Sequence, residues 1–176
     1  MSSILSPRHV WTYRLLFGVL AVALITLKLL PLNLSGGGVP APDLLTALAF
    51  AWIVRQPATV PLGLMIGVFL LADFLLQRPP GLWTLLVILA CESLRRRRLT
   101  MTEFPFLVEW GAVSVAIVGI VVANRIILWL LLVDLDPLGL SLTYGLVTIA
   151  VYPLAVAVSK FVFGLRKLGP AELESL

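Results

Sequence analysis

Five ionisable residues lie inside, or at the ends of, long apolar stretches of the chain. They are Lys28, Asp73, Glu92, Glu109 and Arg125. A charged side chain in a bilayer costs at least ~2.5–3.5 kcal/mol on insertion scales, so it usually has a partner. A carboxylate and a cation held together there could bind an ion or a small molecule, or could join two helices. These residues are therefore the first candidates for a functional or structural role.

The depth at which these residues lie suggests which of them can meet. If the apolar stretches cross a membrane, Lys28, Asp73 and Arg125 fall in the outer part of their spans and can form one cluster. Alternatively, the long side chains of Lys28 and Arg125 extend outward to water. The short side chain of Asp73 cannot do so, and we expect Lys28, Arg125 or the backbone amide of Gly81 to satisfy it.

The two glutamates fall near the inner face, close to the basic run Arg95–Arg98. The simplest expectation is that each glutamate pairs with one of these arginines. An ion-coupled carrier that uses Asp73, Glu92 and Glu109 is a further possibility, because intramembrane carboxylates form ion and proton relays in transporters.

Motifs for catalysis are missing from the sequence. It has no His-Glu-x-x-His, no Gly-x-Ser-x-Gly and no phosphate-binding loop. The single cysteine, Cys91, lies in an apolar run and reads as a buried thiol. The single histidine, His9, precedes the first apolar stretch. We therefore predict no enzymatic activity, no metal site and no cofactor.

Composition places the chain in a membrane. Of 176 residues, 60% are hydrophobic and only 12% are charged, whereas about a quarter of the residues of a soluble domain are charged. A bilayer core takes about 20 apolar residues per helix. We expect one all-α, polytopic membrane domain of about six transmembrane helices, and apolar runs mark the spans at about 15–32, 42–54, 60–76, 81–94, 106–133 and 138–163.

Positive charges predict the orientation, since Lys and Arg accumulate on the cytoplasmic side. Six crossings from an inside N-terminus place Arg55 and Arg95–Arg98 inside and leave Arg78 as the only loop cation outside. Both termini are then cytoplasmic. The basic residues gather at span ends, so the net charge of +4 does not indicate nucleic-acid binding. Leu44–Val54 is too short to cross alone, and we expect residues 39–43 to complete it in extended form.

Tryptophans and small residues add detail to this picture. Trp110 and Trp129 are 19 residues apart, which is about 28 Å along a helix and matches the hydrocarbon thickness. Trp52 is expected at an inner membrane boundary. Small residues four apart, such as Gly63 and Gly67, favour close approach of helix backbones.

An ordered set of residues between positions 42 and 92 resembles the rod shape-determining protein MreD family. In order, these residues are Pro42-Asp43, Trp52, Pro57, Gly67, Asp73, Arg78-Pro79 and Gly81. The sequence departs from the family pattern at two places. Gln77 stands where relatives often carry Gly, and Pro80 replaces a more usual Leu.

The resemblance implies a non-enzymatic scaffold subunit of the cell-wall elongation machinery in the bacterial inner membrane. Such a subunit binds the bitopic protein MreC and connects through it to MreB filaments and wall synthases, within membrane lipid. As structural or partner-binding candidates we take Lys28, Pro42, Asp43, Gly67, Asp73, Arg78, Gly81 and Arg125.

The implied fold is similar to the six-helix substrate-binding subunits of energy-coupling-factor transporters, and this similarity supplies the alternative function. A small-molecule-binding subunit of that type usually carries Ala-x-x-x-Ala in its first span to dock the coupling protein. Here the first span contains Ala21 and Ala23 but no small residues four apart. This absence weighs against transport.

Overall fold

The computed structural model describes residues 7–30, 40–103 and 105–163. No strand occurs among them, which confirms the all-α prediction. The helices are α1 (Pro7–Leu29), α2 (Leu44–Arg55), α3 (Leu62–Leu75), α4 (Leu82–Glu103), α5 (Phe106–Leu130) and α6 (Leu138–Phe161), with a short 3-10 turn, η1, at Pro57–Thr59.

Three helices are long and apolar enough to span a membrane. They are Val10–Leu29 within α1, and the whole of α5 and α6. The outward faces of these helices are apolar too: Leu15, Val115 and Leu146 are each more than 60% exposed. Large exposed aliphatic side chains along all three of these helices are typical of lipid contact. The structure therefore supports a membrane protein, as composition predicted.

The helix boundaries differ from the expected spans at two places. Helix α1 begins at Pro7 rather than near position 15, since proline suits the first turn of a helix. Its expected end at position 32 lies outside the described residues. Helix α4 continues to Glu103 rather than stopping at 94, because arginine is a strong helix former and the basic run continues the helix. Residues 40–43 are non-helical, as expected for the lead into α2.

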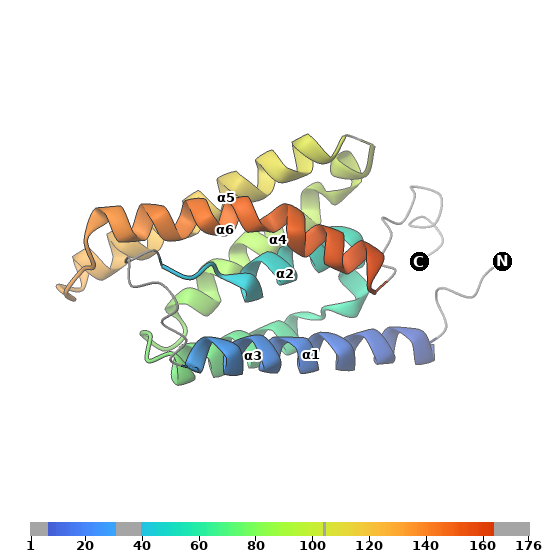
Figure 1. Cartoon of the computed structure of the whole chain (residues 1–176), viewed down its shortest axis with the longest axis horizontal. Coiled ribbons are helices and arrows are strands. Elements are labelled where there is room, and N and C mark those ends of the chain that lie inside the picture. The colour runs from blue at the N-terminus through green and yellow to red at the C-terminus, as the bar shows by residue number, and fades with distance from the viewer. Residues whose placement is uncertain (1–6, 31–39, 104, 164–176) are drawn as a thin grey trace.

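Consecutive helices run in alternating directions, so the bundle has two distinct ends (Figure 1). At one end Lys28, which lies near the end of α1, is close to Asp43 at the start of α2; we call this the Asp43 end. At the other end Arg14 donates to the carbonyl of Ala58, just after α2. We call this the Arg55 end. The first turn of α1 and the last turn of α6 both lie there.

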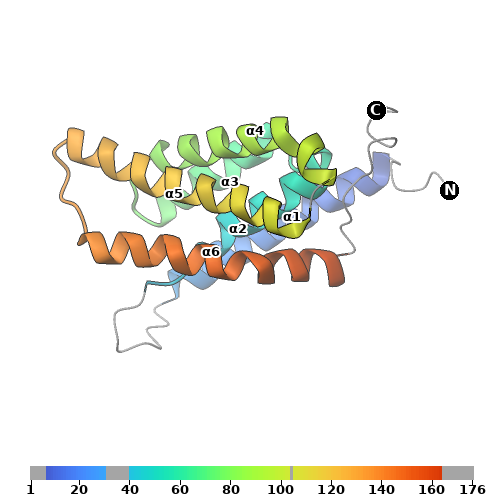
Figure 2. The same cartoon turned by 90° about the horizontal axis from the view of Figure 1, so that it is seen from above.

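The core of the bundle is α2. All residues from Leu45 to Arg55 are buried, and α2 contacts α1, α4 and α6 (Figure 2). Trp52 is fully buried and makes ring contacts with Tyr13, Phe17 and Phe163 at centroid distances of 6.1, 5.4 and 5.9 Å. An aromatic cluster encloses the indole, so Trp52 packs inside the bundle near the Arg55 end, and its level in the membrane stays a prediction.

A backbone carbonyl of α6 that a proline leaves free is bound by a side chain of α5. Pro153 lies inside α6, where it has no N–H to donate to the carbonyl four residues earlier, at Ile149. The indole Nε1 of Trp110 on α5 donates to that carbonyl oxygen at 3.1 Å. In a membrane an unpaired carbonyl is costly. Trp110 therefore has a specific inter-helix partner besides its place near the start of α5.

Candidate functional site

Asp43 caps α2 and ties it to α6. Its Oδ1 accepts a hydrogen bond from the backbone N–H of Thr46 at 3.3 Å. Its own backbone N–H donates to Oγ1 of Thr148 at 3.0 Å. Aspartate is a favoured N-cap because its carboxylate satisfies a free N–H of the first turn. The Pro-Asp pair thus begins α2 at a fixed point against α6, and Pro42 itself is half-buried.

Two side chains from other parts of the bundle approach the second carboxylate oxygen of Asp43. Tyr144 on α6 donates to Oδ2 at 2.7 Å, and Nη1 of Arg78 lies 4.0 Å from the same oxygen. Nη2 of Arg78 donates to the hydroxyl of Tyr144 at 3.3 Å. The guanidinium of Arg78 also lies over the ring of Trp83, at 4.7 Å from its centroid. We call Lys28, Asp43, Arg78, Trp83 and Tyr144 the Asp43 cluster.

Arg78 comes from the turn between α3 and α4. Burial disfavours its charge, but its neighbours Tyr144 and Asp43 outweigh burial and raise the pKa of Arg78 above its ordinary value. The guanidinium is therefore a permanent cation that holds this turn against α2 and α6.

Lys28 completes the cluster without a hydrogen bond. Its Nζ is buried and has no hydrogen-bond partner among the described residues. It lies 5.2 Å from the ring centroid of Tyr144, which is a cation–π geometry. Lys28 therefore belongs to the cluster through its contact with the Tyr144 ring but makes no hydrogen bond within it.

The carboxylate of Asp73 accepts hydrogen bonds from residues at the start of α4. Its Oδ2 accepts from the N–H of Gly81 at 3.0 Å and, on Thr84, from the N–H at 3.1 Å and Oγ1 at 2.7 Å. The expectation that a backbone amide at Gly81 satisfies Asp73 is confirmed. The possible cluster of Lys28, Asp73 and Arg125 is not formed, because amides and a hydroxyl of α4 occupy the carboxylate instead.

The turn between α3 and α4 has two residues in the left-handed region. Gly81 has φ of 86° and Gln77 has φ of 53°. Glycine adopts this conformation without strain, whereas a residue with a Cβ does so at a cost. Gln77, which departs from the family pattern at a position often occupied by glycine, thus lies where the backbone itself favours glycine.

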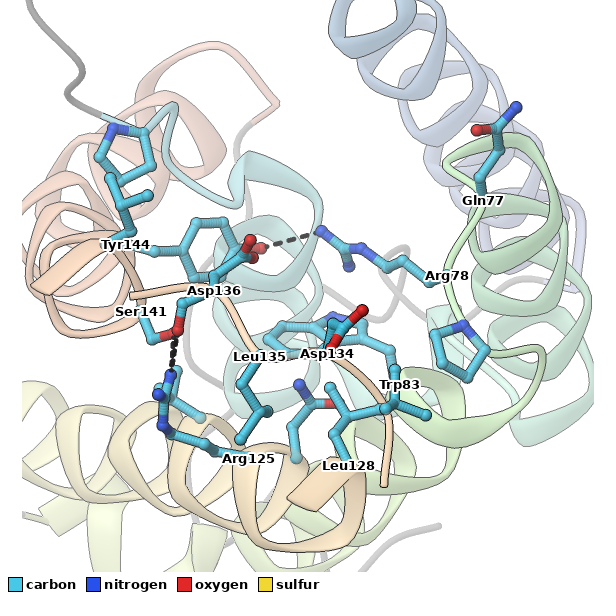
Figure 3. Close-up of a pocket in the computed structure, with 16 residues that line it drawn as sticks. Gln77, Arg78, Trp83, Arg125, Leu128, Asp134, Leu135, Asp136, Ser141 and Tyr144 are labelled. Atoms are coloured by element: carbon cyan, nitrogen blue, oxygen red, sulfur yellow. Dashed lines mark hydrogen bonds between the residues drawn. The ribbon is translucent and has the colours of Figure 1, made fainter. Parts of the chain in front are cut away.

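Arg125 lies on the far side of a cavity from Arg78 (Figure 3). Its Nη1 donates to the backbone carbonyl of Asp136 and to Oγ of Ser141, each at 2.9 Å. The cavity has a volume of about 480 Å³ and opens at the Asp43 end. Asp134 and Asp136 also line it. Arg125 therefore joins α5 to the start of α6 and does not reach Asp73.

A second polar centre lies at the Arg55 end. Nη1 of Arg55 pairs with Oε1 of Glu109 at 2.9 Å, and both side chains are buried. Tyr152 donates to the same oxygen at 2.6 Å. Glu109 was expected to pair within the run Arg95–Arg98, and the partner that the described residues show is Arg55, because α5 passes the end of α2. Glu92 does pair with that run, at 3.3 Å from Arg96.

Gly67 lies apart from both polar centres. It is exposed on α3, and a Cβ built there would have no heavy atom within 4 Å. Gly63 is equally open, so the close helix approach expected at Gly63 and Gly67 does not occur among the described residues. A groove of about 450 Å³ lies instead between α4 and α5, where Ala90, Gly111 and Gly119 are among its lining residues.

The sequence reasoning missed several partners in these centres. Tyr144 and Thr148 both contact Asp43, and their spacing of four places them on one face of α6. That spacing was the available signal. Thr84 and Tyr152 also complete carboxylate sites, but nothing in the sequence links either of them to Asp73 or Glu109.

Both centres hold helices together with hydrogen-bonded charges. The described residues include no group of three His, Cys, Asp or Glu side chains that could bind a metal ion. Comparisons of the chain with protein-family models, with curated proteins and with solved structures find no match.

Proposed function

We propose that this protein is a non-enzymatic membrane scaffold of the MreD type, which binds an MreC-type bitopic protein in the bacterial inner membrane. Through that partner it connects to MreB filaments and wall synthases and so maintains rod shape. The observation that carries the proposal is that most residues of the family-like pattern meet in one place. Asp43 and Arg78 belong to the Asp43 cluster, and Asp73 with Gly81 forms the cap immediately beside it.

This convergence gives the sequence pattern a physical reason. A buried carboxylate at the start of α2, another at the end of α3 and an arginine in the next turn all join elements at the same end of the bundle. The conformation of Gln77 adds support, since its φ of 53° explains why glycine suits this position. Charges that pair with one another inside a bundle hold its helices in place, which suits a scaffold.

Six crossings with both termini in the cytoplasm fit the two ends of the bundle. Arg14, Arg55 and Arg95 lie at the Arg55 end, where their contacts join α1 with η1, α2 with α5, and α4 with the segment before α3. Asp134 and Asp136 lie at the opposite end. The rule that positive charges stay inside makes the Arg55 end cytoplasmic.

The groove between α4 and α5 is the surface on which we place the single transmembrane helix of the partner. Gly111, Val115 and Gly119 are exposed along α5 beside it. Small side chains let a second backbone approach closely, which drives helix association in lipid. An MreC-type protein contributes one such helix.

A small-molecule-binding subunit of an energy-coupling-factor-type transporter is the second candidate. The observation that favours it is the cavity of about 480 Å³ between Arg78 and Arg125, which is within the range of about 300–1,000 Å³ for ligand pockets. In such a subunit this cavity would take the solute from outside.

Depletion in a rod-shaped bacterium separates the two candidates. The scaffold predicts that depleted cells become round while uptake of solutes, measured with labelled vitamins, stays unchanged. Retained rod shape combined with a new vitamin requirement would contradict the scaffold and support the transport subunit. Complementation with the wild-type chain controls for effects on neighbouring genes.

A further inference from the structure

A second cavity lies at the Asp43 end, on the opposite side of Arg78 from the cavity in Figure 3. Its volume is about 310 Å³. Its walls come from the last turns of α1 and α3 and from the segment before α2, and most of them are apolar: Leu24, Leu27, Leu45, Phe69, Ala72 and Leu76. The charged residues in its lining are Lys28, Asp43 and Arg78.

The two acidic side chains near this cavity already accept hydrogen bonds from the protein. Asp43 caps α2, accepts from Tyr144 and lies 4.0 Å from Arg78. Asp73 does not line the cavity; amides at the start of α4 bind its Oδ2, and its buried Oδ1 has no hydrogen-bond partner in the part of the chain that the structure describes. Lys28 is different, because its buried Nζ has no hydrogen-bond partner among the described residues. A buried ammonium without an acceptor is costly.

We propose that this cavity binds an amphipathic anion, namely the acidic headgroup and upper acyl chain of a membrane lipid, with Lys28 as the cation that recognises it. The apolar walls suit a hydrocarbon chain and exclude a free hydrophilic anion as the preferred occupant. The lysine stem is flexible, so a small rotation turns its ammonium toward an acceptor in the cavity.

The position of Lys28 fits a headgroup. It lies one residue before the last residue of α1, so in a membrane-spanning helix it is near the level where acyl chains meet headgroups. The cavity volume is close to the lower limit of about 300 Å³ for ligand pockets, which suits one chain and leaves the second chain of a phospholipid among the surrounding lipids. This inference requires the membrane placement but does not depend on the MreC-type partner.

The test uses the purified full chain without partners, stripped of lipid in a neutral detergent. Native mass spectrometry compares retention of phosphatidylglycerol, phosphatidylcholine with the same chains, and oleate. We expect the two anionic amphiphiles to be retained at least about tenfold more strongly than phosphatidylcholine, a factor that corresponds to ~1.4 kcal/mol. Lys28→Gln should abolish this preference, whereas Lys160→Gln, at an exposed lysine on α6, should preserve it.

Two further variants test whether the lipid occupies the cavity itself. Ala41→Trp fills the cavity from an exposed position in its lining and should also release the lipid, whereas Ala58→Trp at the Arg55 end should not. Retention that ignores lipid charge, or survives both Lys28→Gln and Ala41→Trp, overturns the proposal. Binding of inorganic phosphate that depends on Lys28, without retention of any lipid, also overturns it in favour of a soluble anion.

Discussion

Arg55 and Glu109, 54 positions apart in the sequence, form a buried ion pair of 2.9 Å that joins the end of α2 to the start of α5. Tyr152 adds a hydrogen bond from α6 to the same carboxylate oxygen. The carboxylate of Glu109 thus joins α2, α5 and α6 at the Arg55 end. The Asp43 cluster likewise joins several helices at the other end.

Removing one partner of this pair should leave the other charge buried without a counter-ion. We expect Glu109→Leu to destabilise the protein by about 3–5 kcal/mol, because Arg55 would remain buried without its counter-ion. The double variant Arg55→Leu/Glu109→Leu should be closer to wild type than the sum of the two single changes. Thermal unfolding in detergent measures this, with Glu92→Leu, at a more exposed glutamate, as the control. Additive losses in the double variant would show that the pair is not coupled.

Asp73 should stabilise the protein through its hydrogen bonds to the start of α4. Asp73→Leu leaves the N–H groups of Gly81 and Thr84 without their acceptor, and each unsatisfied buried group costs about 1–3 kcal/mol. We expect a marked loss of thermal stability and of yield. Asp136→Leu is the matched control, since only its backbone carbonyl receives a hydrogen bond from Arg125. Equal stability of the two variants would remove this role.

Gln77 offers the opposite test, a gain in stability. Its left-handed φ of 53° costs a residue with a Cβ roughly 1–2 kcal/mol, while glycine adds about 0.4–1 kcal/mol of unfolded-state entropy. We expect Gln77→Gly to raise stability by up to about 1 kcal/mol. Gln56→Gly, where φ is −141°, should lower it. A destabilised Gln77→Gly protein would argue against this turn conformation.

The apolar pattern was sufficient to predict an all-helical chain and the positions of its helices, because each apolar run must hydrogen-bond its backbone internally. The sequence also offered the Gly81 amide as one of three candidate partners for Asp73, the others being Lys28 and Arg125, and the amide is the one that binds it. The sequence could not show that Glu109 pairs with Arg55 or that Trp52 is enclosed by Tyr13 and Phe17. Those contacts depend on how distant helices pack, which periodicity does not encode.

Membrane orientation can be measured with single cysteines in a Cys91→Ala background. Ala58 and Asp136 are exposed at opposite ends of the bundle, one beside Arg14 and the other on the cavity that Arg78 lines. We expect an impermeant thiol reagent, added to intact spheroplasts, to label Asp136→Cys but to label Ala58→Cys only after lysis. Labelling of Ala58→Cys from outside would overturn the proposed six crossings.

The most direct test of the scaffold is co-purification from native membranes in a mild detergent. The account predicts that the tagged chain brings an MreC-type bitopic protein with it. Gly119→Leu, which fills the groove between α4 and α5, should reduce this recovery severalfold. Gly63→Leu, at an equally open position on α3, should leave the recovery unchanged. Recovery of an ATPase module in place of an MreC-type protein would contradict the scaffold.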